Sequence, residues 1–244
     1  MALIGFSTGA LARGDFRRAL RLQSRSHANA VELSALRESE VDPLINALDE
    51  LDLSGLAYKS FHAPSKLEKM SETYLVSRLR EVARREMPIV VHPDVIKTPS
   101  LWKSLGRWLL IENMDQRKSY GRTVSELEHV FEQLPEARFC FDIGHARQVD
   151  PTMSTSVELL LAFANRLAEI HLSEVGSDSR HVAISSTTAN AYRRVSSIIP
   201  KDIPVILESM VPEDGIEEEL EMALQCFEPN GQNAGGRRLA SGVQ

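Results

Sequence analysis

Short apolar runs recur along the chain, each bounded by polar or turn-forming residues. Runs of this length are typical of strands that are buried on both faces of a parallel sheet. The sequence therefore predicts eight such strands, over residues 3–6, 30–33, 58–61, 89–91, 109–111, 139–141, 169–172 and 205–207.

Between these runs, hydrophobic residues recur every three or four positions, which is the spacing of one helix face. Ser71 and Thr123 are typical N-cap residues, and Thr123 has the capping-box spacing to Glu126. The pattern predicts helices over residues 15–25, 41–51, 72–85, 124–134, 156–167, 189–198 and 216–227, with a short, weak one over 97–103.

The regular alternation of strands and helices predicts an α/β protein. Eight strand–helix units within residues 1–228 fit a single-domain (β/α)8 TIM barrel, whose usual size is about 250 residues, better than an open doubly wound sheet. From Pro229 onward the chain is Gly-rich and loses its periodicity. We therefore expect residues 229–244 to form a flexible C-terminal tail.

The composition narrows the classes of function. Lys and Arg total 28 against 34 Asp and Glu, so the net charge of −6 repels polyanions, and nucleic-acid binding would need a local basic patch. Cys140 and Cys226 lie far apart, which predicts neither a disulfide framework nor a cysteine zinc site and favours a cytoplasmic location. No apolar segment approaches the roughly 18 residues that a membrane span requires.

Metal-ligand residue types follow the predicted strands. In a barrel, the carboxyl ends of the strands converge on one mouth, where active sites are built. Six of the strands end in, or just before, a histidine or a carboxylate, and consecutive members of this set are 20 to 37 residues apart, about one strand–helix unit. We therefore expect six side chains to face one cavity: His62, His92, Glu112, Asp142, His171 and Glu208.

This donor set predicts a divalent metal site. Carboxylates about 4 Å apart repel by roughly 4 kcal/mol at an effective dielectric constant near 20, and a bound cation reverses that sign. Imidazoles mixed with carboxylates suit Zn²⁺ or Mn²⁺, with Fe²⁺ and Mg²⁺ as alternatives and Ca²⁺ less suited. His145 and His181 are further candidates to complete the shell or to hold substrate. Glu32, which ends the second strand, either orients a ligand or forms a salt bridge inside the barrel.

Basic residues near the predicted mouth are candidates for substrate binding. Arg117 and Lys118 follow Glu112 in the loop after the fifth strand, where they could hold a phosphate or a carboxylate. Arg180 is a third candidate, next to His181. A solvated basic loop is the alternative interpretation of Arg117 and Lys118.

The strand-end segments HAP, HP, IEN, FDIGH, IHLSE and ILE resemble those of the xylose isomerase-like TIM barrels, which include sugar isomerases and epimerases and the endonuclease IV family. The resemblance spans residues 1–228. It implies, for the epimerase branch, one metal held by Glu112, Asp142, His171 and Glu208, with the two glutamates also moving protons.

The endonuclease IV branch implies further metals. A second metal of that branch would be held here by His62, His92 and Glu112. A third metal would use His145 and His181, but Ser179 occupies the position of its aspartate.

The chain also departs from the endonuclease IV branch in other ways. Asp178 is one residue out of register with the missing aspartate. Ser65 replaces the aromatic residue that wedges into DNA, and the loops that would grip a duplex are short.

Three hypotheses for the function follow. The first, which the acidic charge and short loops favour, is an isomerase, epimerase or related lyase acting on a small sugar or keto acid, with or without a phosphate. In it, Glu112 and Glu208 exchange protons and His145 binds a substrate oxygen. The second is a two-metal hydrolase of abasic DNA or a small phosphoester, supported by His62 and His92. The third is a non-catalytic binding barrel. We expect one to three ions, a small anionic substrate rather than duplex DNA, and no membrane partner, and the sequence leaves the oligomeric state open.

Overall fold

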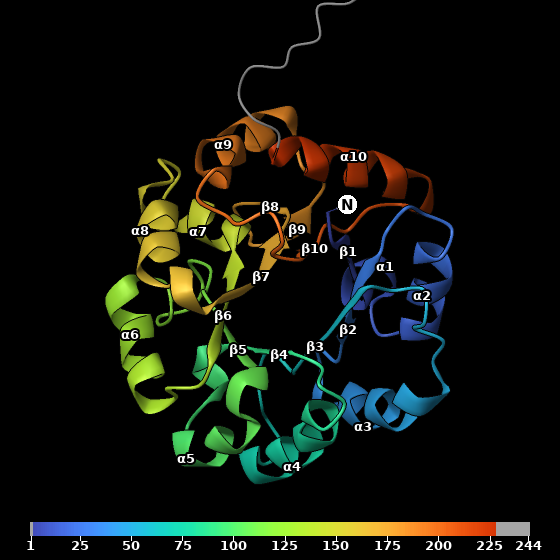
Figure 1. Cartoon of the computed structure of the whole chain (residues 1–244), viewed down its shortest axis with the longest axis vertical. Helices are drawn as coiled ribbons and strands as arrows, with labels where there is room; N and C mark the ends of the chain where they lie inside the picture. Colours follow the sequence, from blue (N-terminus) through green and yellow to red (C-terminus); the bar gives the residue numbers. More distant parts are fainter. Residues whose placement is uncertain (1, 228–244) are drawn as a thin grey trace, which may run out of the picture.

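The computed structural model describes residues 2–227, which form one closed barrel of eight parallel strands (Figure 1). The strand order is β1-β10-β7-β6-β5-β4-β3-β2, so strands that follow one another along the chain lie side by side in the barrel. This confirms the predicted TIM barrel and all eight of its strands. They are β1 (Ile4–Ser7), β2 (Ala30–Ser34), β3 (Tyr58–His62), β4 (Ile89–Val91), β5 (Leu109–Glu112), β6 (Arg138–Asp142), β7 (Leu167–Leu172) and β10 (Val205–Leu207).

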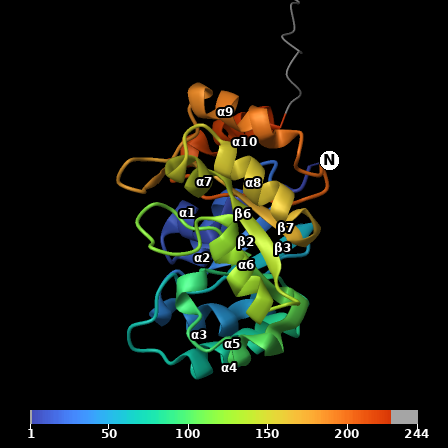
Figure 2. The ribbon, with the colours of Figure 1, turned by 90° about the vertical axis from the view of Figure 1, so that its left-hand side faces the viewer.

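The helices surround the barrel as an outer layer (Figures 1 and 2). Their apolar faces pack against the outward-facing strand residues, which form the main hydrophobic core. Eight of them lie where the sequence predicts helices: α2 (Phe16–Gln23), α3 (Glu38–Ala47), α4 (Glu72–Ala83), α5 (Pro99–Trp102), α6 (Val124–Gln133), α8 (Ser154–Ala162), α9 (Ser186–Ser196) and α10 (Ile216–Cys226).

The two predicted N-caps are confirmed. Ser71 Oγ accepts a hydrogen bond from the backbone N–H of Tyr74 at 3.2 Å, at the start of α4. Thr123 and Glu126 form a reciprocal capping box at the start of α6. These caps satisfy backbone donors that the first helical turn leaves without partners, and so fix where each helix begins.

Short elements at the mouth were not predicted. Helices α1 (Thr8–Ala12) and α7 (Ile143–Val149) follow β1 and β6 directly, and a two-stranded hairpin of β8 (Glu174–Val175) and β9 (His181–Val182) follows β7. Each of these helices begins at the residue after a strand ends, so no polar segment separates the two in the sequence. In Figure 2 the loops that follow β3, β5 and β7 extend from the same side of the barrel, on the left.

Below the predicted ligands of β4, β5 and β6, the inside of the barrel is apolar. Val90, Leu110 and Cys140 form a small apolar cluster with Ala168. Each of the first three lies two residues before a predicted ligand, and alternate residues of a strand share a face. His92, Glu112 and Asp142 therefore form the next layer toward the mouth.

Close packing of β1 on β2 depends on one glycine. A Cβ on Gly5 would lie 1.7 Å from the backbone oxygen of Ala30, so only glycine fits at this position. Within residues 2–227, no helix combines the length and the apolar character that crossing a membrane requires. The predicted tail, residues 229–244, lies outside the described residues.

Candidate metal centre

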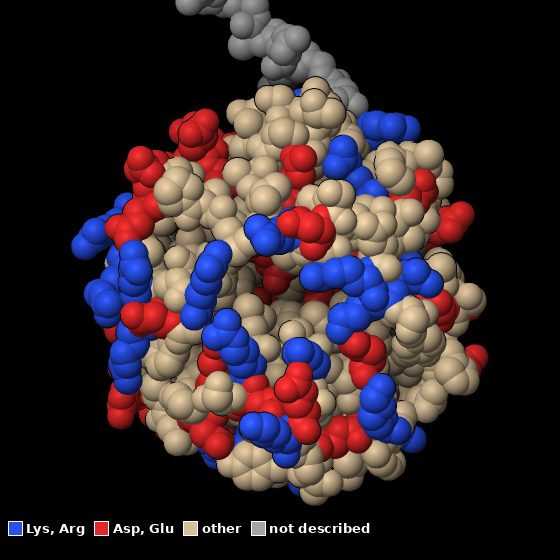
Figure 3. Space-filling view, turned by 180° about the vertical axis from the view of Figure 1, so that it is seen from behind, with Lys and Arg blue, Asp and Glu red and all other residues tan. Residues whose placement is uncertain are grey.

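A cavity of about 210 Å³ opens at the mouth of the barrel. Figure 3 shows it as a hollow with acidic groups visible in its depth and Lys and Arg residues on the surface around it. Six of the predicted metal ligands line the wall, with Asp142 and His171 buried just beneath. The six are His62, His92, Glu112, His145, His181 and Glu208.

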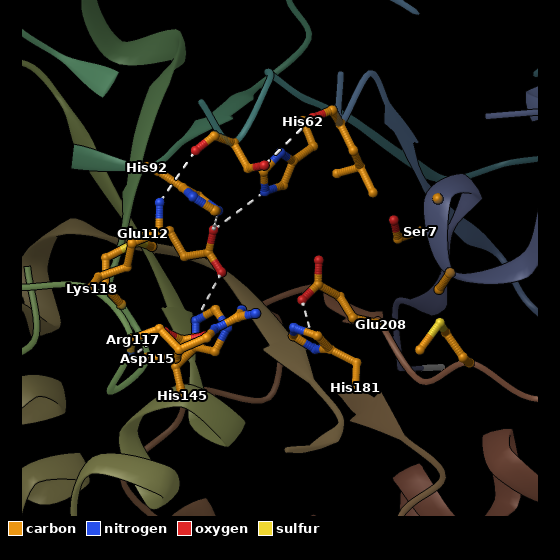
Figure 4. Close-up of a pocket in the computed structure, with 16 residues that line it drawn as sticks. Ser7, His62, His92, Glu112, Asp115, Arg117, Lys118, His145, His181 and Glu208 are labelled. Carbon is orange, nitrogen blue, oxygen red and sulfur yellow. Dashed lines mark hydrogen bonds and ion pairs between the residues drawn. The ribbon is translucent and has the colours of Figure 1, made fainter. Parts of the chain in front are cut away.

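Glu112 is the centre of the cluster (Figure 4). Its Oε2 lies 3.3 Å from His62 Nε2 and 3.2 Å from His92 Nε2. Its Oε1 lies 3.3 Å from His171 Nδ1 and 3.4 Å from His145 Nδ1. The carboxylate thus joins two groups of imidazoles, one at each oxygen.

Hydrogen bonds to the backbone orient two of these imidazoles. His62 Nδ1 donates to the backbone oxygen of Ala63 at 2.7 Å, which leaves Nε2 to face Glu112. His145 Nδ1 donates to the backbone oxygen of Asn113 at 3.0 Å. Such contacts select the ring nitrogen that is left as a metal ligand.

The geometry fits metal ions. Ligand atoms about 2.0–2.1 Å from a tetrahedral zinc are about 3.3–3.4 Å from one another, which matches the separations around Glu112. Among the described residues, five groups each bring their ligand atoms within 4.8 Å of one another, and three of these contain only predicted ligands. They are His62, His92 and Glu112; Glu112, Asp142, His171 and Glu208; and Asp142, His145 and His181.

Asp142 has a buried oxygen that accepts no hydrogen bond. Its Oδ1 accepts the backbone N–H of His145 at 2.7 Å and caps α7, whereas its Oδ2 lies 3.4 Å from His145 Nδ1 and accepts no hydrogen bond. Buried carboxylate oxygens normally have a partner, and a cation would supply one here. The orphaned oxygen therefore supports a metal in the group that Asp142 shares with Glu112, His171 and Glu208.

The third group differs from the arrangement that the resemblance implies. Ser179 is buried with φ +57° and bonds to Gln148, and Asp178 is exposed and pairs with Arg180. Neither provides the missing aspartate. Asp142 instead supplies the carboxylate that accompanies His145 and His181.

The buried carboxylates of the site have no buried Lys or Arg as partners among the described residues. In the described part of the chain no Lys or Arg is buried, yet the barrel interior holds several buried carboxylates. Burial, and then the negative charges of Glu208 and Glu112, raise the pKa of Asp142 well above its usual range. Divalent cations would remove this excess of negative charge. The four buried carboxylates of the interior are Glu32, Glu112, Asp142 and Glu169, and Glu208 is only 13% exposed.

The surroundings shift the pKa values of His62 and His92 in opposite directions. Burial opposes protonation of His62, but Glu32 and Glu112 outweigh it and raise its pKa to about 9. Burial lowers the pKa of His92. For Glu112, burial is outweighed by His171 and His92, which lower its pKa well below the usual range. A metal binding here would displace protons from imidazoles, so its affinity should depend on pH.

Two of the three predicted substrate-binding cations lie at the cavity. Arg117 lines it and makes two hydrogen bonds to Asp115 Oδ2, at 2.9 and 2.6 Å. Lys118 also lines it and bonds to Asp94 at 2.6 Å. Arg180 pairs with Asp178 on the exposed hairpin and is not among the lining residues, so its role stays a prediction.

Sequence reasoning missed three residues near the site. Ser7 lines the cavity at the end of β1, where the strand-end rule could have found it. Glu169 lies two residues before His171 and so on the same strand face, which was a usable signal. Tyr58 begins β3 and reaches Glu169 across the barrel, which no local pattern reveals.

Comparison with solved structures finds the same TIM-barrel fold in other proteins. The 3-keto-D-glucoside 4-epimerase YcjR from E. coli is 10% identical, with a TM-score of 0.60 over 92% of this chain and 100% of that chain. Endonuclease IV from Thermus thermophilus is 18% identical, with a TM-score of 0.58 over 92% of this chain and 97% of that chain.

A xylose isomerase-like TIM barrel protein from Mycobacterium smegmatis, in complex with magnesium, is 12% identical, with a TM-score of 0.54 over 89% of this chain and 91% of that chain. No protein-family model matches the sequence, and no curated protein matches it either. At these identities the likenesses establish the fold, and the chemistry has to be argued from the site.

Proposed function

We propose that this chain is a divalent-metal-dependent enzyme that hydrolyses a small phosphoester at a pair of ions bridged by Glu112. The observation that carries the proposal is the position of the Glu112 carboxylate, whose two oxygens each face two imidazoles. Both oxygens of the Glu112 carboxylate therefore lie among imidazoles, and neither is left free to exchange a proton with a substrate. Such a carboxylate suits a bridging ligand better than a proton carrier, which reverses the order in which the sequence placed the two enzymatic hypotheses.

The donor atoms fit two ions, with Zn²⁺ or Mn²⁺ as the expected metals. Two divalent cations, when bound, would supply Lewis-acid stabilisation of the attacking and leaving oxygens at phosphorus. One ion would be held by His62, His92 and Glu112, and the other by Glu112, Asp142, His171 and Glu208.

Glu208 is suited to handle the proton of the attacking water. It lines the cavity and is the least enclosed of the interior carboxylates, at 13% exposure. His181 Nδ1 lies 3.3 Å from Glu208 Oε2 and holds it toward the cavity. As the water oxygen bonds to phosphorus, Glu208 takes its proton, and the bond from phosphorus to the leaving oxygen breaks.

The cavity favours a small anionic substrate. Its volume of about 210 Å³ is below the roughly 300–1,000 Å³ that is typical of sites for drug-sized ligands. Arg117 and Lys118 stand at its rim and can pair with phosphate oxygens. The net charge of −6 disfavours a nucleic-acid duplex.

An isomerase, epimerase or related lyase is the second candidate. It is favoured by the convergence of Glu112, Asp142, His171 and Glu208 on one ion position, and the solved structures of this fold include an epimerase. In this reaction, Glu112 and Glu208 would exchange protons with a sugar or keto acid, and His145 would bind a substrate oxygen. Glu208→Gln would then abolish solvent deuterium uptake into the substrate, and uptake at the wild-type rate would remove this candidate.

Metal content separates the two candidates. Protein purified without chelators or metal-affinity resin would be analysed by plasma mass spectrometry beside a His62→Ala/His92→Ala double variant. We expect two or more equivalents per chain in the wild type and one fewer in the variant. A single equivalent that the variant leaves unchanged would favour the isomerase candidate.

Activity should be measured on a chromogenic phosphodiester and a chromogenic phosphomonoester, with Zn²⁺ and Mn²⁺ supplied in turn. We expect hydrolysis of at least one of them and no cleavage of an abasic duplex. Activity that persists at the wild-type level in the double variant would contradict the two-ion mechanism.

A further inference from the structure

A second polar layer lies below the metal centre and converges on His171. The Nδ1 atom of His171 faces Glu112 at 3.3 Å and Glu208 at 3.6 Å. The opposite nitrogen, Nε2, faces Glu169 Oε1 at 2.9 Å and Glu32 Oε2 at 3.1 Å. The side chains of His171, Glu169 and Glu32 are fully buried, so no solvent competes for these contacts.

Each of the two lower carboxylates is itself held. Tyr58 Oη donates a hydrogen bond to Glu169 Oε2. Tyr58 is on β3 and Glu169 on β7, which are four strands apart in the eight-stranded ring, so this contact crosses the whole barrel.

Glu32 is fixed from the other side. Ser34 Oγ donates to Glu32 Oε1 at 3.2 Å. Ser34 Oγ in turn lies 2.6 Å from Ser7 Oγ, and Ser7 lines the cavity. A continuous set of polar contacts therefore runs from the cavity wall to the lower nitrogen of His171.

Resting on the metal site proposed above, we infer that Glu169 and Glu32 are positioning residues for His171. They fix its ring and keep its proton on Nε2, so that the Nδ1 lone pair is presented to the cation. Tyr58 in turn holds Glu169 in place. An imidazole whose Nε2–H is held by a carboxylate cannot rotate without breaking that bond, and it is a more basic ligand at the other nitrogen. Two buried carboxylates that share one nitrogen repel each other, and a cation at the opposite nitrogen of the ring would offset that repulsion.

The test measures Zn²⁺ affinity by competition with a chromophoric chelator. Glu169→Gln keeps the size and polarity of the side chain but removes its charge, and Glu169→Ala removes the contact. We expect both variants to bind one Zn²⁺ about 10- to 100-fold more weakly than the wild type. Tyr58→Phe removes only one hydroxyl, and should weaken binding in the same direction by a smaller factor.

The matched control is Glu72→Gln. Glu72 is also a carboxylate that accepts several N–H hydrogen bonds, from Lys97, Thr98 and Trp102, but it lies in the helical layer. We expect its Zn²⁺ affinity to equal that of the wild type. A loss of affinity in the control as large as in Glu169→Gln would overturn the inference, because a general loss of stability would then explain both.

A second measurement reports which nitrogen of the His171 ring is protonated and which one binds the metal. The ¹⁵N chemical shifts of His171 in the zinc-loaded wild type should show a protonated Nε2 and a metal-bound Nδ1. In Glu169→Ala the Nε2 proton should exchange faster or the ring should change its ligand nitrogen. Wild-type affinity together with wild-type shifts in Glu169→Ala would overturn the inference.

Failure of the inference can be told from failure of the proposed function. If the wild type binds no Zn²⁺, the metal site fails and the inference falls with it. If the wild type binds Zn²⁺ and both Glu169 variants bind it equally well, only the inference is wrong. Should Glu169→Ala fail to fold, Glu169→Gln and Tyr58→Phe decide the question, and unchanged affinity in both would refute the role.

Discussion

Glu112 Oε2 lies 3.3 Å from His62 Nε2, and both side chains are buried although 50 residues separate them in the chain. The two residues end strands β5 and β3, on either side of β4 in the barrel. Parallel strands end at the same edge, so residues that are distant in sequence meet at the mouth. This contact is why removal of either residue should affect the same ion.

Replacement of the bridging carboxylate should remove the metal pair. Glu112→Gln leaves one amide nitrogen where an anionic oxygen faced two imidazoles, so it can no longer bridge two cations. We expect the metal content to fall from two or more equivalents to one or fewer, measured by plasma mass spectrometry. Retention of the full metal content would contradict the bridging role.

The metal-free protein should lose stability as the pH rises. The pKa of His62 is about 9 in the folded chain against 6.5 for the free side chain. Its contribution, on the order of 3 kcal/mol, is therefore fully present below pH 6.5 and is lost as the pH rises through 9. Urea unfolding of chelator-treated protein across this range measures it, and His62→Gln, as the comparison, should show a smaller loss.

Asp142→Asn should separate stability from metal binding. The amide oxygen can still accept the backbone N–H of His145, while the charge that burial and two carboxylates disfavour is removed. Without metal, we expect a melting temperature equal to or above that of the wild type. With Zn²⁺ supplied, the wild type should gain stability and the variant should gain much less. An equal gain in both proteins would argue against Asp142 as a ligand.

The capping box at α6 provides a prediction independent of the site. Thr123→Ala removes the side-chain acceptor for the N–H of Glu126 and should cost about 1 kcal/mol of unfolding free energy. Denaturant titration measures the loss. The metal content should not change, because α6 lies in the outer layer, and a change would show that the site depends on this helix.

Much of the fold could be predicted because its signals are local. The predicted bounds of β4 and β10 agree with the structure at both ends. Turn-forming residues on both sides of a short apolar run mark where a buried strand begins and ends. Ser71 and Thr123 marked the starts of α4 and α6 through their own side chains. Helices α1 and α7 were not predicted because each begins directly after a strand, without a polar segment between the two.

Alternation and spacing along the chain were enough to specify the barrel and the residue types at its strand ends. Which of those side chains contact one another is decided only by the tertiary structure. Folding placed Glu112 between four imidazoles, left Asp142 Oδ2 without a hydrogen bond, and brought Tyr58 across the barrel to Glu169. These relationships depend on the closure and packing of strands far apart in the chain, which fix distances of a few ångströms that no local pattern encodes.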